Sequence, residues 1–345
     1  MATLKQQKAF TYFVGIDVSR DKLDCVLMFG KKMLHHKVIP NSPLEISQFI
    51  KDIKATEGLK LGKTVFGLEQ TGIYTSHLLD KLKRAKAHIV IEDAVHIKNS
   101  LGKIRGKYDK LDAIRIANYL YKTKGELRLW EQRRQIIDEL AHLSTLRNRL
   151  LRLYNSMKVP LDEEGGFLSA VLVKRDAELC QDSLSSLKND ILKVEQAIIG
   201  TIQSDEHVRR LFAIITSVPY VGTVTAVQII IATNEYSDIT DAKKFASYAG
   251  IAPFRNESGT VQGKAKISHL ANKKIKALLH ICAMASVSKE SELRAYYVRK
   301  TQEEGKPKMA VLNAIRNKII LRIFACLKHD RFYQKEYVRG AMQGV

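Results

Sequence analysis

Cysteine is scarce in this sequence, and long apolar runs are missing altogether. Its four cysteines (Cys25, Cys180, Cys282 and Cys326) are widely scattered, with no Cys-x-x-Cys pair and no Cys/His cluster. This pattern argues against a structural zinc site and against a disulfide framework. No run of about 18 apolar residues occurs, and the first ten residues lack the apolar core of a signal peptide. We therefore expect no membrane association and a cytoplasmic location.

Acidic residues are outnumbered by basic ones. The chain has 36 Asp+Glu against 57 Lys+Arg, which gives a net charge of +21 in 345 residues. Residues 243–345 alone hold 21 Lys+Arg and 7 Asp+Glu. Such an excess favours a polyanionic partner, because each neutralised phosphate releases condensed counterions. We expect a dedicated nucleic-acid surface near the carboxyl end, and a protein that associates with the nucleoid.

Apolar patterning divides the chain into three predicted domains, residues 1–130, 131–205 and 206–345. The first alternates strand and helix signals and is predicted to form a mixed sheet with helices on its faces. Its expected strands are residues 12–18, 23–29, 36–39, 64–68 and 88–91, and its expected helices are residues 43–53 and 74–86.

Residues 131–205 show heptad spacing in two stretches separated by Gly165 and Gly166. Leu140, Leu143 and Leu150 belong to the first stretch, and the second carries a similar apolar series up to Ile198. Two long helices joined by a loop predict an antiparallel coiled-coil arm or a dimerisation element. A globular helical bundle is the alternative.

The third predicted domain is mainly helical and basic. Its segment Val218–Ala226 resembles the hairpin of a helix-hairpin-helix element. In such an element a glycine turn, here Gly222 and Thr223, presents backbone N–H groups to a phosphate. The alternative is a simple connection between two helices.

Four carboxylates carry the chemistry of the first domain. Asp17 and Glu69 each end an apolar strand, while Asp109 and Asp112 have the i, i+3 spacing of one helical face. Hard divalent cations need such oxygen ligands, and a pair of them can promote phosphodiester cleavage. Each acid alone could simply be a strand-end or helix-terminal charge. Together they predict a Mg²⁺ site, with Mn²⁺ as a substitute.

The order of these motifs resembles the RuvC-like branch of the ribonuclease H fold. With the downstream region, the chain resembles the DEDD transposases of the insertion-sequence-110 family. The motifs that carry the resemblance are Gly15–Ser19, Leu68–Gly72, Lys107–Ala113, Pro219–Ala226, Tyr248–Pro253, Ser258-Gly259 and Lys266–Asn272.

The resemblance implies a nucleophilic serine, which matches Ser258 in a polar, glycine-containing loop after Pro253. Exposure and nearby cations suit such a nucleophile. The family pattern has a basic residue and glycine where this chain has Thr260, His269 and Ala271. Those departures concern the surrounding DNA contacts. The predicted nucleic-acid contacts are Gly222, Thr223, Arg255, Lys264, Lys266, Lys273 and Lys274.

The resemblance further implies a transposase that cleaves and rejoins donor and target DNA through a covalent phosphoserine. It implies guidance by a structured bridge RNA and homodimers that pair into tetramers. Two other functions are alternatives. One is a RuvC-like nuclease that uses water, and the other is a non-catalytic nucleic-acid-binding scaffold. A sugar kinase is disfavoured, because no further Gly-rich phosphate loop follows the first strand.

Overall fold

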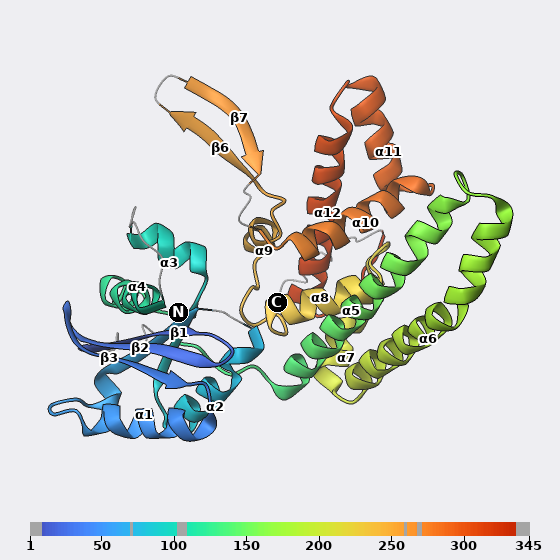
Figure 1. The fold of residues 1–345 in the computed structure, drawn as a ribbon. Helices are drawn as coiled ribbons and strands as arrows, with labels where there is room; N and C mark the ends of the chain where they lie inside the picture. Colours follow the sequence, from blue (N-terminus) through green and yellow to red (C-terminus); the bar gives the residue numbers. More distant parts are fainter. Residues whose placement is uncertain (1–8, 70–71, 102–108, 259–260, 268–270, 336–345) are drawn as a thin grey trace. The chain divides into compact units, whose positions relative to one another are not determined.

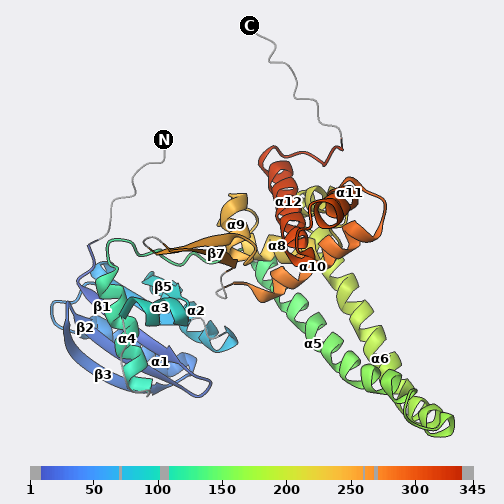
Figure 2. The same ribbon diagram turned by 90° about the horizontal axis from the view of Figure 1, so that it is seen from above.

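The computed structural model describes residues 9–69, 72–101, 109–258, 261–267 and 271–335. The chain forms two compact units, residues 1–132 and 133–345 (Figures 1 and 2). Within the described ranges, no helix is both long enough and apolar enough to span a membrane.

A five-stranded mixed sheet forms the centre of the first unit. Its spatial order is β3-β2-β1-β4-β5, with the first three strands antiparallel and β4 and β5 parallel to β1. The predicted mixed sheet is therefore confirmed. The strands are β1 (Tyr12–Val18), β2 (Lys22–Phe29), β3 (Lys32–Pro40), β4 (Thr64–Glu69) and β5 (His88–Glu92).

Helices cover both faces of this sheet (Figure 1). Successive side chains of a strand point to opposite faces, so β1 contributes to two cores. Val14 and Ile16 are buried on the side of α1 and α2, whereas Phe13 is buried on the side of α3 and α4. The helical elements are α1 (Pro43–Ala55), η1 (Leu61–Lys63), η2 (Gly72–Thr75), α2 (Ser76–Arg84), α3 (Ala94–Leu101) and α4 (Asp109–Lys122).

Two glycines let α4 approach the sheet closely. Gly15 on β1 and Gly67 on β4 are neighbours in the parallel register. A Cβ on Gly15 would lie 2.1 Å from the carbonyl oxygen of Ala113 in α4. On Gly67 it would lie 2.7 Å from a methyl group of Leu120. The packing of α4 on the sheet therefore requires the absence of side chains at these positions.

The second unit is mostly helical and shares one hydrophobic core. Its two longest helices, α5 and α6, run side by side (Figures 1 and 2). Both predicted long helices are present, and coiled-coil packing along their length stays a prediction. The helices are α5 (Gln135–Glu164), α6 (Ala170–Gln203), α7 (Glu206–Ser217), α8 (Thr223–Thr233), α9 (Ala242–Tyr248), α10 (Lys273–Ser288), α11 (Glu292–Val298), η3 (Arg299–Glu303) and α12 (Lys308–Lys328).

The helical pair is not a separate compact unit. Ile137 and Leu140 of α5 and Ile198 of α6 are buried in the same core as α8, α10 and α12. Residues 135–203, predicted as an arm between two domains, therefore share a compact unit with residues 206–335. The physical cause is that the apolar stripe at the base of the pair is covered by the helices that follow it.

One expectation for the second unit is wrong. The polar composition after Pro253 predicts a loop, but this segment forms an antiparallel hairpin of β6 (Pro253–Ser258) and β7 (Val261–Ile267). Val261, Ala265 and Ile267 alternate with polar residues, which is the period of a strand. That alternation is the signal that identifies the hairpin.

Candidate functional site

Two of the predicted acids lie at one edge of the sheet. β1 and β4 are parallel, and Ile16 is paired with Leu68 in their register. Asp17 and Glu69, the next residues along each strand, therefore lie at the same carboxyl-terminal edge. Each side chain is partly buried, so its charge is only incompletely solvated.

The first turn of α4 adds the other two acids. Asp109 and Asp112 lie one turn apart there, as their spacing predicts. Burial raises the pKa of Asp17 to about 6, and the nearby carboxylates of Asp112, Asp109 and Glu69 add to the shift. Like charges at short range disfavour ionisation. The structure thus brings all four predicted carboxylates into one electrostatic neighbourhood.

Further acids follow the neighbouring strand. Burial raises the pKa of Glu69, and the carboxylates of Asp112 and Asp93 raise it further. Glu92, which is paired with Glu69 in the register of β4 and β5, accepts a 2.7 Å hydrogen bond from the Tyr119 hydroxyl. Burial opposes ionisation of Glu92, but hydrogen bonds from Tyr119, the Asp93 N–H and His96 hold its pKa below the usual value. The Glu92 carboxylate therefore already has hydrogen-bond donors within the chain.

Two basic side chains partly neutralise this edge. The Lys22 ammonium lies 2.6 Å from Asp109 Oδ2 and 3.2 Å from Asp24 Oδ2. Arg115 lies 2.6 Å from Asp112 Oδ1. The chain's own cations therefore compete for two of the four carboxylates.

The donor chemistry of this edge fits a hard divalent cation. All four predicted ligands are carboxylates, and their mutual repulsion would be relieved by a positive ion. Among the described residues, no three His, Cys, Asp or Glu side chains converge closely enough to hold one ion. An ion that binds all four carboxylates would compete with Lys22 for Asp109 and with Arg115 for Asp112.

Sequence reasoning missed Lys22, Asp24, Asp93 and Arg115. Asp24 is 4% exposed and lies opposite Asp17 in the antiparallel register of β1 and β2. A tight turn between these two strands is visible in the sequence, so their register could have identified Asp24. The contact of Lys22 with Asp109 depends on where α4 packs, for which no local signal exists. Arg115 and Asp112 have i, i+3 spacing within α4, so their ion pair could have been predicted from the sequence.

In the second unit, Ser258 is the last residue of β6 and is paired with Val261 of β7. This places the predicted nucleophile at the far end of the hairpin from its connections to α9 and α10. The side chains of Arg255, Ser258, Lys264 and Lys266 lie outside the part of the chain that the structure describes.

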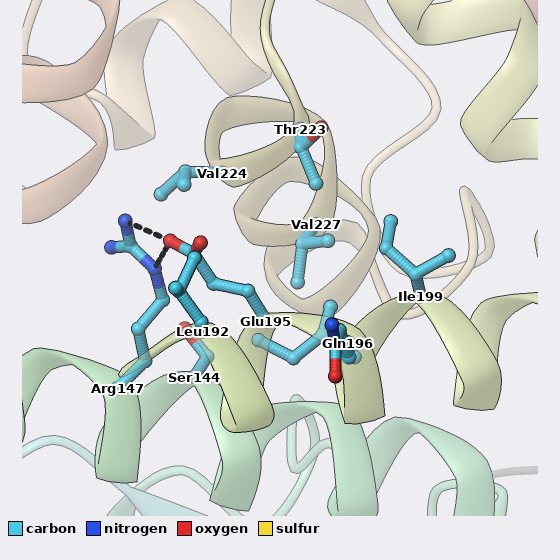
Figure 3. Close-up of a pocket in the computed structure, with 10 residues that line it drawn as sticks. Ser144, Arg147, Leu192, Glu195, Gln196, Ile199, Thr223, Val224 and Val227 are labelled. Carbon is cyan, nitrogen blue, oxygen red and sulfur yellow. Dashed lines mark hydrogen bonds and ion pairs between the residues drawn. The ribbon is translucent and has the colours of Figure 1, made fainter. Parts of the chain in front are cut away.

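The predicted phosphate-binding turn lies at the amino terminus of α8. Gly222 is the N-cap residue and offers no side chain to the first N–H groups of the helix. Thr223 lines a cavity of about 500 Å³ between α5, α6 and α8, beside the ion pair of Arg147 and Glu195 (Figure 3). The cavity wall is otherwise largely apolar, and a helix-hairpin-helix role for this turn stays a prediction.

The two predicted lysines lie in the first turn of α10, and both are exposed. The Lys274 ammonium lies 3.4 Å from Ser144 Oγ, which also accepts a hydrogen bond from Gln228. Burial lowers the pKa of Lys274, and the charges of Arg147 and Arg152 lower it further. Lys274 thus lies in a local concentration of positive charge, as expected for a polyanion-binding surface.

Two family models match this chain. A model for DEDD transposases of the IS110 type matches residues 14–163, and the model described as the transposase IS116/IS110/IS902 family matches residues 212–298. Together the matches cover more than half of the sequence. The first includes all four carboxylates and the second includes Ser258. The chain belongs to the IS110 family of transposases.

Its relatives include the pilin gene-inverting protein of Moraxella bovis, 24% identical over 78% of this chain and 81% of the relative. The IS110 43.6 kDa protein of Streptomyces coelicolor is 27% identical over 46% of this chain and 39% of its own length. A solved structure of Thermus thermophilus RuvC with a Holliday junction substrate matches at 14% identity and a TM-score of 0.28, covering 35% of this chain and 99% of that one.

Proposed function

We propose that this transposase cleaves and rejoins donor and target DNA through a covalent bond to Ser258, with its RuvC-like first unit holding Mg²⁺. The observation that carries the proposal is the crowding of carboxylates around Asp17, whose pKa is raised to about 6. Partly buried, mutually repelling acids at a sheet edge are destabilising on their own, and a bound cation offsets that cost. Perturbed pKa values of this kind cluster at functional sites.

The chain's own residues have distinct roles in this mechanism. Asp17, Glu69, Asp109 and Asp112 would hold the metal. When bound, Mg²⁺ would supply Lewis-acid chemistry at the scissile phosphate and at the attacking hydroxyl. The Ser258 hydroxyl loses its proton, and its oxygen bonds to phosphorus as the bond to the leaving deoxyribose oxygen breaks. That oxygen takes up a proton.

Rejoining is the reverse of this exchange. A DNA hydroxyl attacks the phosphoserine and displaces the serine oxygen, which regains its proton. One phosphorus–oxygen bond replaces another at each step, so no ATP is needed. A relative named a gene-inverting protein supports rejoining over hydrolysis, because inverting a gene requires that cut ends be joined again.

Guidance by a bridge RNA and assembly of dimers into tetramers are part of the proposal as implications of family membership. The concentration of basic residues in 243–345 supports a second polyanionic partner besides DNA. A-form RNA helices are bound mainly through shape and backbone contacts, which a cationic helical surface can supply.

An RNA-supplied recombination assay tests the proposal with wild type, Asp17→Asn and Ser258→Ala. We expect a protein–DNA adduct from wild type that survives denaturation, and none from either variant. Removal of Mg²⁺ with EDTA should abolish the adduct, and Mn²⁺ should restore it. Ser288→Ala, at the end of α10, serves as the matched serine control and should still form the adduct.

Three results would contradict the proposal or favour another interpretation. Strand cleavage by Ser258→Ala without any adduct from wild type would indicate a RuvC-like nuclease that uses water. Full activity of Asp17→Asn would contradict the metal site. Tight nucleic-acid binding with no cleavage under any metal condition would indicate a non-catalytic scaffold.

A further inference from the structure

The chain segments at the base of the β6–β7 hairpin are tied to each other. Tyr248 ends α9 before the hairpin, and Asn272 is the N-cap residue of α10 after it. The Asn272 N–H donates to the Tyr248 carbonyl oxygen at 2.9 Å. The Asn272 side-chain amide donates to the Tyr248 hydroxyl oxygen, also at 2.9 Å. Two hydrogen bonds therefore join residues that are 24 positions apart in the sequence.

Each partner is also fixed by its own helix. Asn272 Oδ1 accepts the N–H of Ile275 at 3.0 Å, which caps α10. The Tyr248 ring packs against Phe245, which is fully buried and stacks in turn on Phe324 of α12. Neither side chain can shift without disturbing a cap or an aromatic contact.

A third polar contact holds the same base from α12. The Asn313 amide donates to the carbonyl oxygen of Ile251 at 2.8 Å. Ile251 is 1% exposed, and its N–H bonds back to Ala246 of α9 at 2.8 Å. Between them, Gly250 has φ +64°, a backbone conformation that favours glycine. The backbone that leads from α9 into β6 is therefore held by hydrogen bonds of Ile251 and by the conformation of Gly250.

We propose that Tyr248, Asn272 and Asn313 form a hairpin clasp that positions the β6–β7 hairpin, and with it Ser258, for attack on the scissile phosphate. The inference rests on the proposed role of Ser258. A two-stranded hairpin is marginally stable alone, so its direction depends on how its ends are held. A misplacement of about 1 Å can cost ~100-fold in rate, which makes such support important for a nucleophile.

The clasp residues are positioning residues and do not touch the reacting atoms. Their effect on the reaction rate is therefore measured separately from DNA binding and from global stability. The Tyr248–Asn272 pair offers the sharper test, because the hydrogen bond can be removed from either side. Tyr248→Phe removes the hydroxyl and keeps the ring. Asn272→Ser keeps a good helix cap but shortens the side chain, so that it no longer reaches Tyr248.

Asn272→Asp provides a conservative rescue. A carboxylate still caps α10, and it can accept a hydrogen bond from the Tyr248 hydroxyl, which reverses the direction of the original bond. Asn272→Asp should therefore retain function in the presence of Tyr248 and lose it when combined with Tyr248→Phe. Tyr296→Phe is the matched control, because it keeps the ring that Lys318 contacts at 4.7 Å.

Two readouts test the clasp. One is the rate of adduct formation at saturating DNA, with DNA affinity and melting temperature measured on the same samples. The other is amide hydrogen exchange of residues 253–258 and 261–267 without DNA. We expect Tyr248→Phe and Asn272→Ser each to slow adduct formation about 5-fold, the factor for one net hydrogen bond of ~1 kcal/mol. Exchange in the hairpin should be faster and DNA affinity unchanged, and the melting temperature should fall by no more than the loss of one hydrogen bond allows, roughly 2–4 °C.

Other outcomes overturn the clasp. Unchanged hairpin exchange and adduct rate in both single variants would do so. A larger fall in melting temperature, together with weaker DNA binding and an unchanged adduct rate at saturating DNA, would show a merely structural role. If Asn272→Asp is equally active with Tyr248 and with Tyr248→Phe, the hydrogen bond between the two residues does not contribute to function. If wild type forms no adduct, the proposed role of Ser258 fails, while hydrogen exchange still decides whether the clasp holds the hairpin.

Discussion

In the first unit the acids of the proposed site extend from a buried sheet and from a helix packed directly on it, whereas in the second the serine stands at the end of a hairpin held at its base. The acids are positioned by close packing, which requires Gly15 and Gly67. In our proposal, the hairpin that carries Ser258 is held by directional hydrogen bonds, from Asn272 to Tyr248 and from Asn313 to Ile251. Substitutions that disturb the packing of α4 should therefore destabilise the fold of the first unit. Substitutions in the clasp should mainly change the placement of the hairpin in the second unit.

The two regions also differ in charge. Burial and the surrounding carboxylates raise the pKa of Asp17 to about 6, while residues 243–345 hold three times as many basic as acidic residues. The first arrangement suits a cation and the second suits a polyanion. Four substitutions test this contrast, in decreasing order of expected effect.

Gly15→Ala should have the largest effect. Its Cβ would lie 2.1 Å from a backbone oxygen of α4, which cannot move without the helix. We expect a loss of about 3 kcal/mol or more in the free energy of unfolding. Gly67→Ala should cost about 1 kcal/mol, because it meets the flexible end of Leu120. Gly62→Ala, with nothing within 4 Å, is the control for urea unfolding. Equal losses at all three would contradict the packing argument.

Asp17→Asn should stabilise the metal-free protein at pH 7. The folded-state pKa of about 6 exceeds the ordinary 3.8, so the native state binds more protons between these values. Stability therefore falls as pH rises through this window, and the variant escapes the loss. After allowance for solvent screening, we expect about 1 to 2 kcal/mol at pH 7 and almost none at pH 4.

Urea unfolding in EDTA at both pH values measures this difference. Mg²⁺ should reduce the difference in free energy of unfolding between the variant and the wild type, because it stabilises only the wild type. A destabilised variant at pH 7 would show that the carboxylate is already compensated within the chain.

Lys273→Glu should weaken binding of duplex DNA about 10-fold and reduce the slope of affinity against salt concentration by about 1. Lys273 is exposed at the start of the cationic helix α10. Lys51→Glu on α1, exposed in the first unit, is the matched control and should change little. Titrations at several salt concentrations measure both. Equal effects would mean that the nucleic-acid surface is not confined to the second unit.

Lys22→Gln should have the smallest effect, about 3-fold tighter binding of Mn²⁺, because exposed ion pairs contribute little. The ammonium now contacts Asp109 and Asp24, so its removal frees carboxylate oxygens for an ion. Calorimetric titration measures the affinity, with Lys31→Gln in the β2–β3 turn as the control. Weaker binding would show that Lys22 helps to place Asp109.

Much of the first unit could be predicted from its sequence. Its strands and helices follow strong periodicities, and the ends of parallel strands meet at one edge, which brings Asp17 and Glu69 together. Asp109 and Asp112 share a helical face for the same local reason. The hairpin carrying Ser258 was missed, because glycine and charged residues weaken its alternation. The contact of Lys22 with Asp109 was missed because it depends on the packing of α4, whereas the i, i+3 spacing of Asp112 and Arg115 was available in the sequence.

The sequence by itself determined the family, the order of the strands in the first unit, and which four carboxylates to propose as a site, because these depend on local pattern and short motifs. Only the tertiary structure decided which groups surround Asp17 and how far its pKa is raised. It alone tied Tyr248 to Asn272 and Asn313 to Ile251 across long stretches of chain. Such contacts depend on where separate helices and strands pack against each other, and local periodicity in the sequence does not predict this packing.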